Sequence, residues 1–160
     1  ASRIGIHRDT WGTNIFEQVN WWAPINNLDQ TNTLIFYPEY FNQPIKNTTS
    51  TWDLDTYFKK RKLGEFDYPS APQLLEDLKK ETKTIRVNIN PGEILCFSGS
   101  HLHSSSKENS NTSRFSYEIR TVSDSDIRGK RYAPNVDCAL NAKYPKIFKH
   151  MVTKNILEIN

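Results

Sequence analysis

Apolar and polar residues alternate in short runs along most of this chain, and clusters of polar turn residues separate the runs. An alternation with a period of two is typical of half-buried β-strands, because successive side chains point to opposite faces. We therefore predict strands over 16–25, 33–37, 84–89 and 114–122, and a short apolar strand within 91–100. Short strands with turns between them favour a sandwich or jelly roll.

Helical patterns are confined to the middle and the end of the chain. Residues 54–62 are expected to form a short helix, and another is expected near 144–152. Ser70 and Gln73 have the spacing of a capping box, which predicts a third helix over 74–80. The expected fold class is therefore mainly β, with a few flanking helices.

The composition is that of one globular domain. The chain has 160 residues, of which 36% are hydrophobic and 12% aromatic, enough to bury a core. The net charge is only +3 and the longest basic run is 59–62, so a nucleic-acid partner is not expected. No apolar run approaches the length of about 18 residues that suggests a membrane span, so none is expected. Cys96 and Cys138 do not make a disulfide framework; we expect a buried Cys96 and a reducing, cytoplasmic location.

The segment His7-Arg8-Asp9, together with His103, carries the most specific chemistry in the chain. Two imidazoles and one carboxylate form the facial triad that holds non-haem Fe(II) and leaves coordination positions open. Residues i and i+2 of a strand point to the same side, so His7 and Asp9 converge if 3–9 ends a strand. The alternative is a surface histidine beside a solvated aspartate at a turn.

A second pair of histidines, His101 and His103, follows the strand predicted within 91–100. Both share one face of an extended segment, but only one is needed to complete a triad. We assign that role to His103 and expect His101 to be a hydrogen-bonded structural histidine. Arg114 lies eleven residues after His103, where a fixed guanidinium could clamp a carboxylate through two parallel hydrogen bonds.

The order of these motifs resembles that of the Fe(II)/2-oxoglutarate-dependent dioxygenases, and the phytanoyl-CoA dioxygenase-like branch fits best. The resemblance covers residues 3–122 and consists of His-x-Asp, a Gly-Glu-apolar strand that leads to a histidine, and an arginine eleven positions later. It implies a double-stranded β-helix, that is, a jelly-roll or cupin-like barrel. It also implies that His7, Asp9 and His103 are the catalytic metal ligands.

The same resemblance implies an activity. Fe(II) would be the cofactor and O2 the oxidant, while Arg114 and Ser116, on one strand face, would bind the distal carboxylate of the co-substrate 2-oxoglutarate. A small-molecule substrate would be hydroxylated or otherwise oxidised, with release of succinate and CO2. Related halogenases replace the aspartate with Gly or Ala, so the presence of Asp9 favours hydroxylation or desaturation over halogenation.

Two further sets of polar residues are candidates for the site. Gln18 and Asn20 share one face of a predicted strand, so we expect one of the two amides to hydrogen-bond the co-substrate. The alternative for them is a polar outer face. Arg120 shares a face with Arg114 and either contacts an anionic substrate group or pairs with a neighbour such as Glu118.

Residues 1–160 are expected to form a single jelly-roll catalytic domain. Because His7 lies so close to Ala1, we expect the N-terminal helices and the first strand of the dioxygenase fold to be missing from this chain. Two alternatives remain open. A cupin-type metal enzyme without 2-oxoglutarate would leave Arg114 and Ser116 unexplained. A non-catalytic jelly-roll module, such as a capsid or lectin-like domain, would make the histidines incidental.

Overall fold

The computed structural model describes residues 5–106 and 113–159, whose regular structure consists of short strands and a few short helices. The strands are β1 (Val19–Pro24), β2 (Leu34–Phe36), β3 (Ile85–Arg86), β4 (Leu95–Ser98), β5 (His103–Ser105) and β6 (Ser116–Thr121). The helices are α1 (Thr10–Thr13), α2 (Leu54–Lys62), α3 (Asp124–Arg128) and the 3-10 helices η1 (Pro38–Phe41) and η2 (Pro145–Ile147).

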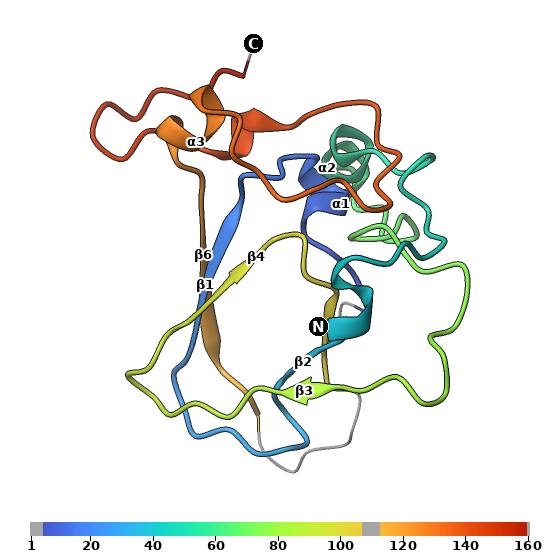
Figure 1. Cartoon of the computed structure of the whole chain (residues 1–160). Helices are drawn as coiled ribbons and strands as arrows, with labels where there is room; N and C mark the ends of the chain where they lie inside the picture. Colours follow the sequence, from blue (N-terminus) through green and yellow to red (C-terminus); the bar gives the residue numbers. More distant parts are fainter. Residues whose placement is uncertain (1–4, 107–112, 160) are drawn as a thin grey trace.

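The strands pair into two three-stranded antiparallel sheets, with the orders β4-β1-β6 and β3-β2-β5. The chain crosses from one sheet to the other after β1, β3, β4 and β5 (Figure 1). The sheets face each other, since the rings of Phe36 in β2 and Phe97 in β4 meet edge to face with centroids 5.1 Å apart. The fold is β-rich, as the alternation predicts, and the described strands do not close into a barrel.

The space between the sheets contains an apolar core cluster and, on the inner faces of β1 and β6, polar side chains. The apolar core cluster there consists of Trp22, Leu34, Phe36, Val87 and Phe97. The register of the first sheet places Asn20 of β1 opposite Phe97 of β4 and opposite Arg120 of β6. Directly opposed residues point to the same face, so Asn20 and Arg120 face the interior together with the core.

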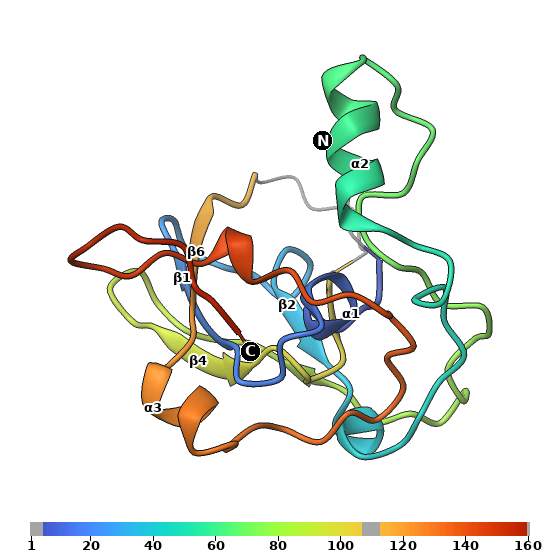
Figure 2. The ribbon, with the colours of Figure 1, turned by 90° about the horizontal axis from the view of Figure 1, so that it is seen from above.

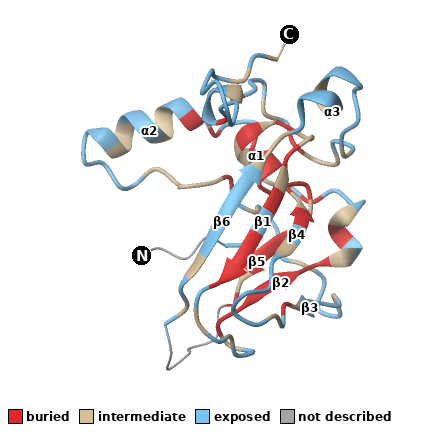
Figure 3. Ribbon diagram, turned by 90° about the vertical axis from the view of Figure 1, so that its left-hand side faces the viewer, coloured by how far each residue is buried: buried red, intermediate tan, exposed pale blue. Residues whose placement is uncertain are grey.

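The strands differ in how far their residues are buried. Figure 3 shows β1 and β2 mostly buried, whereas β6, at the edge of its sheet, is exposed along most of its length. The prediction that Cys96 is buried is wrong, because this residue lies on the outer face of the edge strand β4 and is exposed. Within the described ranges, no helix is long and apolar enough to cross a membrane.

Helix α2 confirms the helix predicted over 54–62. Asp53 caps its start, because the side chain accepts a hydrogen bond from the backbone N–H of Thr56 at 2.6 Å. Basic residues fill the last turn, 59–62, where they offset the negative end of the helix dipole. The helix projects away from the sheets (Figure 2) and of its residues only Leu54 is buried.

The helices predicted over 74–80 and 144–152 are wrong. Leu74 instead forms an isolated β-bridge with Asn47, so long-range pairing takes backbone groups that a helix would need. In the second region only the 3-10 turn η2 forms, after which the chain folds back on itself in another isolated bridge. In both places a backbone bridge replaces the predicted helix, a long-range bridge at Leu74 and a local one between Lys149 and Ile156. By contrast, the five strands predicted from the alternation each contain an observed one, although β3 keeps only two residues. These predictions are 16–25, 33–37, 84–89, the stretch within 91–100, and 114–122.

Candidate metal centre

Three side chains of metal-ligand type, His7, Asp9 and His103, meet in the interior and are buried. One ligand atom of each lies within 4.8 Å of the others. His7 Nε2 is 3.6 Å from Asp9 Oδ1, and His103 Nε2 is 3.8 Å from Asp9 Oδ2. Ligand atoms at about 2.0–2.2 Å from a metal ion lie roughly 3 Å apart. A small inward movement would therefore let all three bind one ion.

A short antiparallel bridge brings the two histidines together. His7 and His103 exchange both backbone hydrogen bonds, at 2.9 and 3.0 Å, and their ring centroids are 4.4 Å apart. The strand end that would make His7 and Asp9 converge by alternation does not form within residues 5–9, where only His7 is bridged; residues 1–4 lie outside the described range. Asp9 instead has helical φ −66° and ψ −31° and precedes α1. A turn, not strand alternation, therefore directs this carboxylate toward the histidines.

Both imidazoles are held in the orientation that a metal site needs. His7 Nδ1 lies 2.9 Å from the carbonyl oxygen of Gly5, and His103 Nδ1 lies 2.9 Å from that of His101. A carbonyl oxygen only accepts hydrogen bonds, so each Nδ1 must carry the proton and donate it. The lone pair then resides on Nε2, the atom that lies nearest to Asp9 in both rings. Such an anchored Nδ1 is typical of histidine metal ligands.

Asp9 is oriented by one amide and one guanidinium. Asn20 Nδ2 donates to Asp9 Oδ2, and Arg120 Nη2 donates to Asp9 Oδ1 at 3.0 Å. Gln18 Nε2 donates to Asn20 Oδ1 at 2.8 Å, and Thr13 Oγ1 donates to Gln18 Oε1 at 3.2 Å. This hydrogen-bonded series fixes which end of the Asn20 amide faces Asp9, and thereby the orientation of the carboxylate.

These contacts decide some of the expectations for the polar residues. Gln18 and Asn20 are fully buried, so the alternative of a polar outer face is excluded. That one of them binds a co-substrate stays a prediction, because here Gln18 contacts Asn20, and Asn20 contacts Asp9. Arg120 pairs with Glu118, with Nε 2.7 Å from Oε1, as one of the two expectations had it. Its contact with Asp9 was not predicted.

The electrostatics of the cluster favours a charged Asp9 and a neutral His103. Burial opposes the ionisation of Asp9, but the His7 ring and the neighbouring positive groups hold its pKa well below the usual range. Burial and the nearby His7 lower the pKa of His103 to about 4. Burial also acts to lower the pKa of His7, yet the contact with Asp9 outweighs it and raises that pKa. A cation therefore competes with a proton mainly at His7.

Aromatic rings cover the His103 side of the cluster. The ring of Phe36 stacks on His103 with centroids 5.6 Å apart, and Phe97 meets His103 edge-on at 5.2 Å. His101 lies outside the triad, with its ring stacked on Phe41 at 3.9 Å and its carbonyl anchoring His103. The apolar rings exclude water from one side of the site, which strengthens the electrostatic interactions there.

Arg114 and Ser116 approach the interior from the β6 side. Arg114 Nη2 donates to Ser105 Oγ at 3.0 Å, and Arg114 Nη1 donates to the carbonyl of Asn32 at 3.2 Å. Ser105 lies two positions after His103 on β5, so the two side chains share a face about 7 Å apart along the strand. Ser116 is the first residue of β6. The carboxylate clamp expected of this pair stays a prediction.

A buried ion pair beside the triad was not predicted from the sequence. Arg8 lies between the two ligands His7 and Asp9, and its Nε donates to Asp137 Oδ1 at 3.0 Å. Both side chains are almost completely buried, with 2% and 4% exposed. The sequence did offer a signal for Arg8, because this charged residue stands between the two candidate ligands His7 and Asp9. No local pattern marks Asp137, which lies 129 positions further along the chain.

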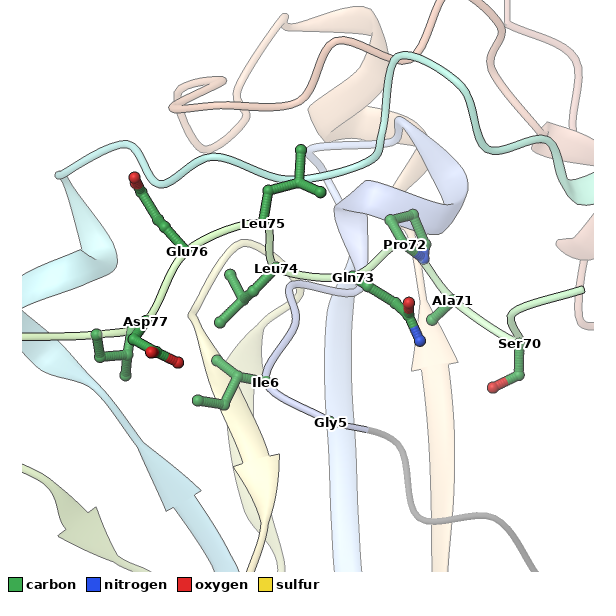
Figure 4. A pocket seen from close by; sticks show the side chains of 11 residues that line it. Gly5, Ile6, Ser70, Ala71, Pro72, Gln73, Leu74, Leu75, Glu76 and Asp77 are labelled. Carbon is green, nitrogen blue, oxygen red and sulfur yellow. The ribbon is translucent and has the colours of Figure 1, made fainter.

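A cavity of about 500 Å³ lies beside the segment that leads into His7. Its lining consists of Gly5, Ile6 and the segment 70–78 (Figure 4). Gly5 and Ile6 lead directly into His7, so the cavity borders the chain that delivers this ligand. The triad itself is not part of the lining. The cavity therefore adds no chemistry of its own to the metal centre.

No protein-family model, curated protein or solved structure matches this chain. The assignment of a function therefore depends on the chemistry of the residues that the fold brings together.

Proposed function

We propose that this protein is a non-haem Fe(II)- and 2-oxoglutarate-dependent oxygenase that hydroxylates, or otherwise oxidises, a small-molecule substrate. In the hydroxylation, substrate C–H, 2-oxoglutarate and O2 become the C–OH product, succinate and CO2. The observation that carries the proposal is the pair of Nδ1-anchored histidines that face one buried carboxylate. Incidental histidines, as in a binding or structural module, have no reason to share this arrangement.

Fe(II) fits the donor set, because two imidazole nitrogens and one carboxylate oxygen on adjacent corners leave positions for other ligands. When bound, the iron would supply the redox chemistry that couples the decarboxylation of 2-oxoglutarate to oxygen transfer. The residues of the protein itself would bind the iron, orient its ligands and exclude water. Asn20 and Arg120 hold the Asp9 carboxylate in place, while Phe36 and Phe97 exclude water beside His103.

The proposed 2-oxoglutarate site extends from the triad toward Arg114. The Arg114 guanidinium contacts Ser105, which is roughly 7 Å along β5 from His103, a separation comparable with the length of a five-carbon dicarboxylate. A planar guanidinium suits a distal carboxylate because it can donate two parallel hydrogen bonds. Ser116, on the same strand face, would add a hydroxyl to the same carboxylate.

The proposed architecture is a jelly roll. Two antiparallel sheets face each other, and the chain repeatedly crosses between them, which is the pattern of double-sheet jelly rolls. In such a fold the triad and the arginine would lie on the inner faces of the sheets. The inward direction of Asn20, Arg120 and His103 supports this placement.

A metal-dependent enzyme that does not use 2-oxoglutarate is a second candidate. The observation that favours it is that Arg114 already donates to two protein acceptors, Ser105 and the carbonyl of Asn32. An arginine that only crosslinks the two sheets would need no carboxylate ligand. The triad would then still bind a metal ion.

Anaerobic titration with Fe(II) and 2-oxoglutarate tests the proposal. We expect a weak visible charge-transfer band, because the keto acid chelates the ferrous ion. In Arg114→Gln the band should need a 2-oxoglutarate concentration higher by on the order of tenfold or more, because a charged hydrogen-bond pair is lost. Arg131→Gln, which removes an exposed pair with Asp126, is the matched control and should behave like the wild type.

Each failure of this titration has its own meaning. A wild-type protein that gives no band would overturn the proposed oxygenase. A band whose dependence on 2-oxoglutarate is the same in Arg114→Gln would remove the clamp. If iron binds but 2-oxoglutarate produces no band, the second candidate takes the place of the first.

A further inference from the structure

Arg8 donates hydrogen bonds to several segments of the chain at once. Its Nε and Nη2 bind the carboxylate of Asp137, each with a contact of 3.0 Å. The remaining acceptors are main-chain carbonyls: Nη1 donates to Ser100 at 2.8 Å, and Nη2 donates to Tyr40 at 2.6 Å and Gln43 at 3.0 Å. The side chain that separates the ligands His7 and Asp9 therefore connects four parts of the fold.

The Asp137 carboxylate also accepts hydrogen bonds from other parts of the chain. Besides Arg8, its Oδ1 accepts from the indole Nε1 of Trp11 at 2.7 Å, and its Oδ2 accepts from the backbone N–H of Ile45 at 3.1 Å. Trp11 belongs to α1, the helix that starts directly after Asp9. The carboxylate of Asp137 thus binds the chain on both sides of the metal ligand Asp9.

Other residues of the segment 135–140, which carries Asp137, also contact α1 and the residue that follows it. Asn14 Nδ2 donates to the carbonyl of Leu140 at 3.0 Å, and Cys138 Sγ lies 3.7 Å from the carbonyl of Thr10. Figures 1 and 2 both show this part of the chain running beside α1. The contacts fix the turn that aims Asp9 at the histidines.

The contact with Ser100 links this arrangement to the other half of the site. Ser100 immediately precedes the residues that lead to His103, and its carbonyl accepts from Arg8. One guanidinium therefore holds the His7–Asp9 stretch against the segment that supplies the third ligand. Metal ligands act only when they are held within a fraction of an ångström of the productive geometry, which is the task of such outer contacts.

We propose that Arg8 and Asp137 are positioning residues of the metal centre, through which the segment 135–140 sets the affinity for the metal ion. Neither side chain touches the ion in this arrangement; both act through the backbone of His7 and Asp9. The inference rests on the proposed metal centre, and it goes beyond it by making a segment that contributes no ligand part of the site. A purely structural clamp would change stability and leave metal affinity unchanged.

Titration with Co²⁺, followed by the visible absorption of the bound ion, distinguishes these two roles. The variants are Asp137→Asn, which removes the charge, and Arg8→Lys, which keeps a charge but cannot reach all the acceptors. Asp53→Asn is the matched control, because it makes the same acid-to-amide change. It disturbs one local hydrogen bond, from Thr56, and one long-range hydrogen bond, from Tyr144, and it contacts neither Arg8 nor Asp137. Urea unfolding of the same preparations shows that each variant is folded during the titration.

We expect Asp137→Asn to weaken Co²⁺ binding by about 10- to 100-fold, the usual effect of outer contacts on metal affinity. Arg8→Lys should weaken it less, and both should alter the absorption spectrum of the bound ion. Asp53→Asn should bind like the wild type, even if its stability falls. If Asp137→Asn does not fold, Arg8→Lys decides the question.

Wild-type affinity and an unchanged spectrum in the folded Arg8 and Asp137 variants would overturn this inference and leave the metal centre in place. A wild-type protein that binds no Co²⁺ would overturn the metal centre and, with it, the inference. The two failures are therefore told apart by the wild type alone.

Discussion

Two arginine–carboxylate pairs flank the metal-ligand segment, and they differ in how far solvent reaches them. In the pair of Arg8 and Asp137, the side chains are 2% and 4% exposed. In the pair of Arg120 and Asp9, the Asp9 side chain is 3% exposed but the Arg120 side chain is 40% exposed. The first pair is closed in the protein interior, whereas the second joins a buried carboxylate to a partly solvated cation.

The carboxylates of the two pairs also differ in their remaining capacity to bind. Asp137 accepts hydrogen bonds from Arg8, Trp11 and the backbone of Ile45, so its oxygens are occupied by donors. Each oxygen of Asp9 accepts a hydrogen bond from one donor, and each also faces the Nε2 atom of a histidine ring. One carboxylate therefore fixes structure, and the other keeps room for a cation. Four predictions, from the largest effect to the smallest, test this difference.

Removal of the charge on Asp137 should cost the most. Asp137→Asn leaves the buried Arg8 without its counter-ion, and we expect the free energy of unfolding to fall by about 3–5 kcal/mol. At the other pair, Arg120→Gln removes the cation and leaves the carboxylate. It should cost less than Asp137→Asn, because the Arg120 side chain is partly exposed and because Asn20 and His7 still contact Asp9. Urea unfolding of both variants without metal measures the two losses. Equal losses would contradict the distinction between the pairs.

Loss of the amide that orients Asp9 should weaken the metal site without a comparable loss of stability. Asn20→Ala removes the hydrogen bond to Oδ2, and we expect the affinity for Fe(II) or Co²⁺ to fall by about 10- to 100-fold. Metal titration with a spectroscopic readout measures this. Asn26→Ala serves as the control, because it removes a half-buried amide that is bonded to the carbonyl of Ser113 and the N–H of Phe115 and does not contact Asp9. Unchanged affinity in Asn20→Ala would mean that Asp9 needs no such support.

Metal affinity should rise with pH. The pKa of His7 is raised, so in the metal-free protein this imidazole binds a proton over the range below that pKa, and a cation must displace it. Affinity should therefore fall as the pH is lowered through the His7 pKa, by up to about tenfold per pH unit for one proton. His103, with its pKa of about 4, should not add to this slope above that pH. Titrations between pH 5.5 and 8 give the slope, and a flat profile in this range would contradict the assignment of the competing proton to His7.

Neutralisation of Arg120 should have the smallest effect on metal binding, in the opposite direction. Arg120→Gln removes a positive charge beside the site, so we expect a cation to bind a few-fold more tightly, with the gain reduced at high salt. Titrations at low and high ionic strength measure both. Weaker binding in this variant would show that Arg120 supports the Asp9 orientation more than it repels the ion.

Local sequence patterns predicted the three residues of the candidate metal site, but not the contacts that hold them in place. Residue type and spacing were enough to select His7, Asp9 and His103, because few side chains bind metal ions and the resemblance orders them. The predicted reason for their convergence was partly wrong, since Asp9 is directed by a turn. Strand alternation located most strands, because it depends only on the nearest neighbours along the chain.

Features that depend on distant parts of the chain could not be predicted. The periodicity over 74–80 is helical, yet Leu74 pairs with Asn47 instead of forming a helix. A single sequence gives no sign of which distant residue Leu74 will pair with. The local sequence does not distinguish Asp137 from other aspartates, because its partner Arg8 is far away in the sequence. The contacts that complete this candidate site are long-range ones.

Anaerobic Fe(II) binding to the wild type and to two histidine variants tests the metal centre most directly. His103→Ala removes a proposed ligand, whereas His101→Ala removes a neighbouring imidazole that lies outside the triad. We expect a single bound ion in the wild type and in His101→Ala, and its loss in His103→Ala. A wild-type protein that retains no iron, or a His103→Ala variant that binds it as tightly as the wild type, would contradict the account.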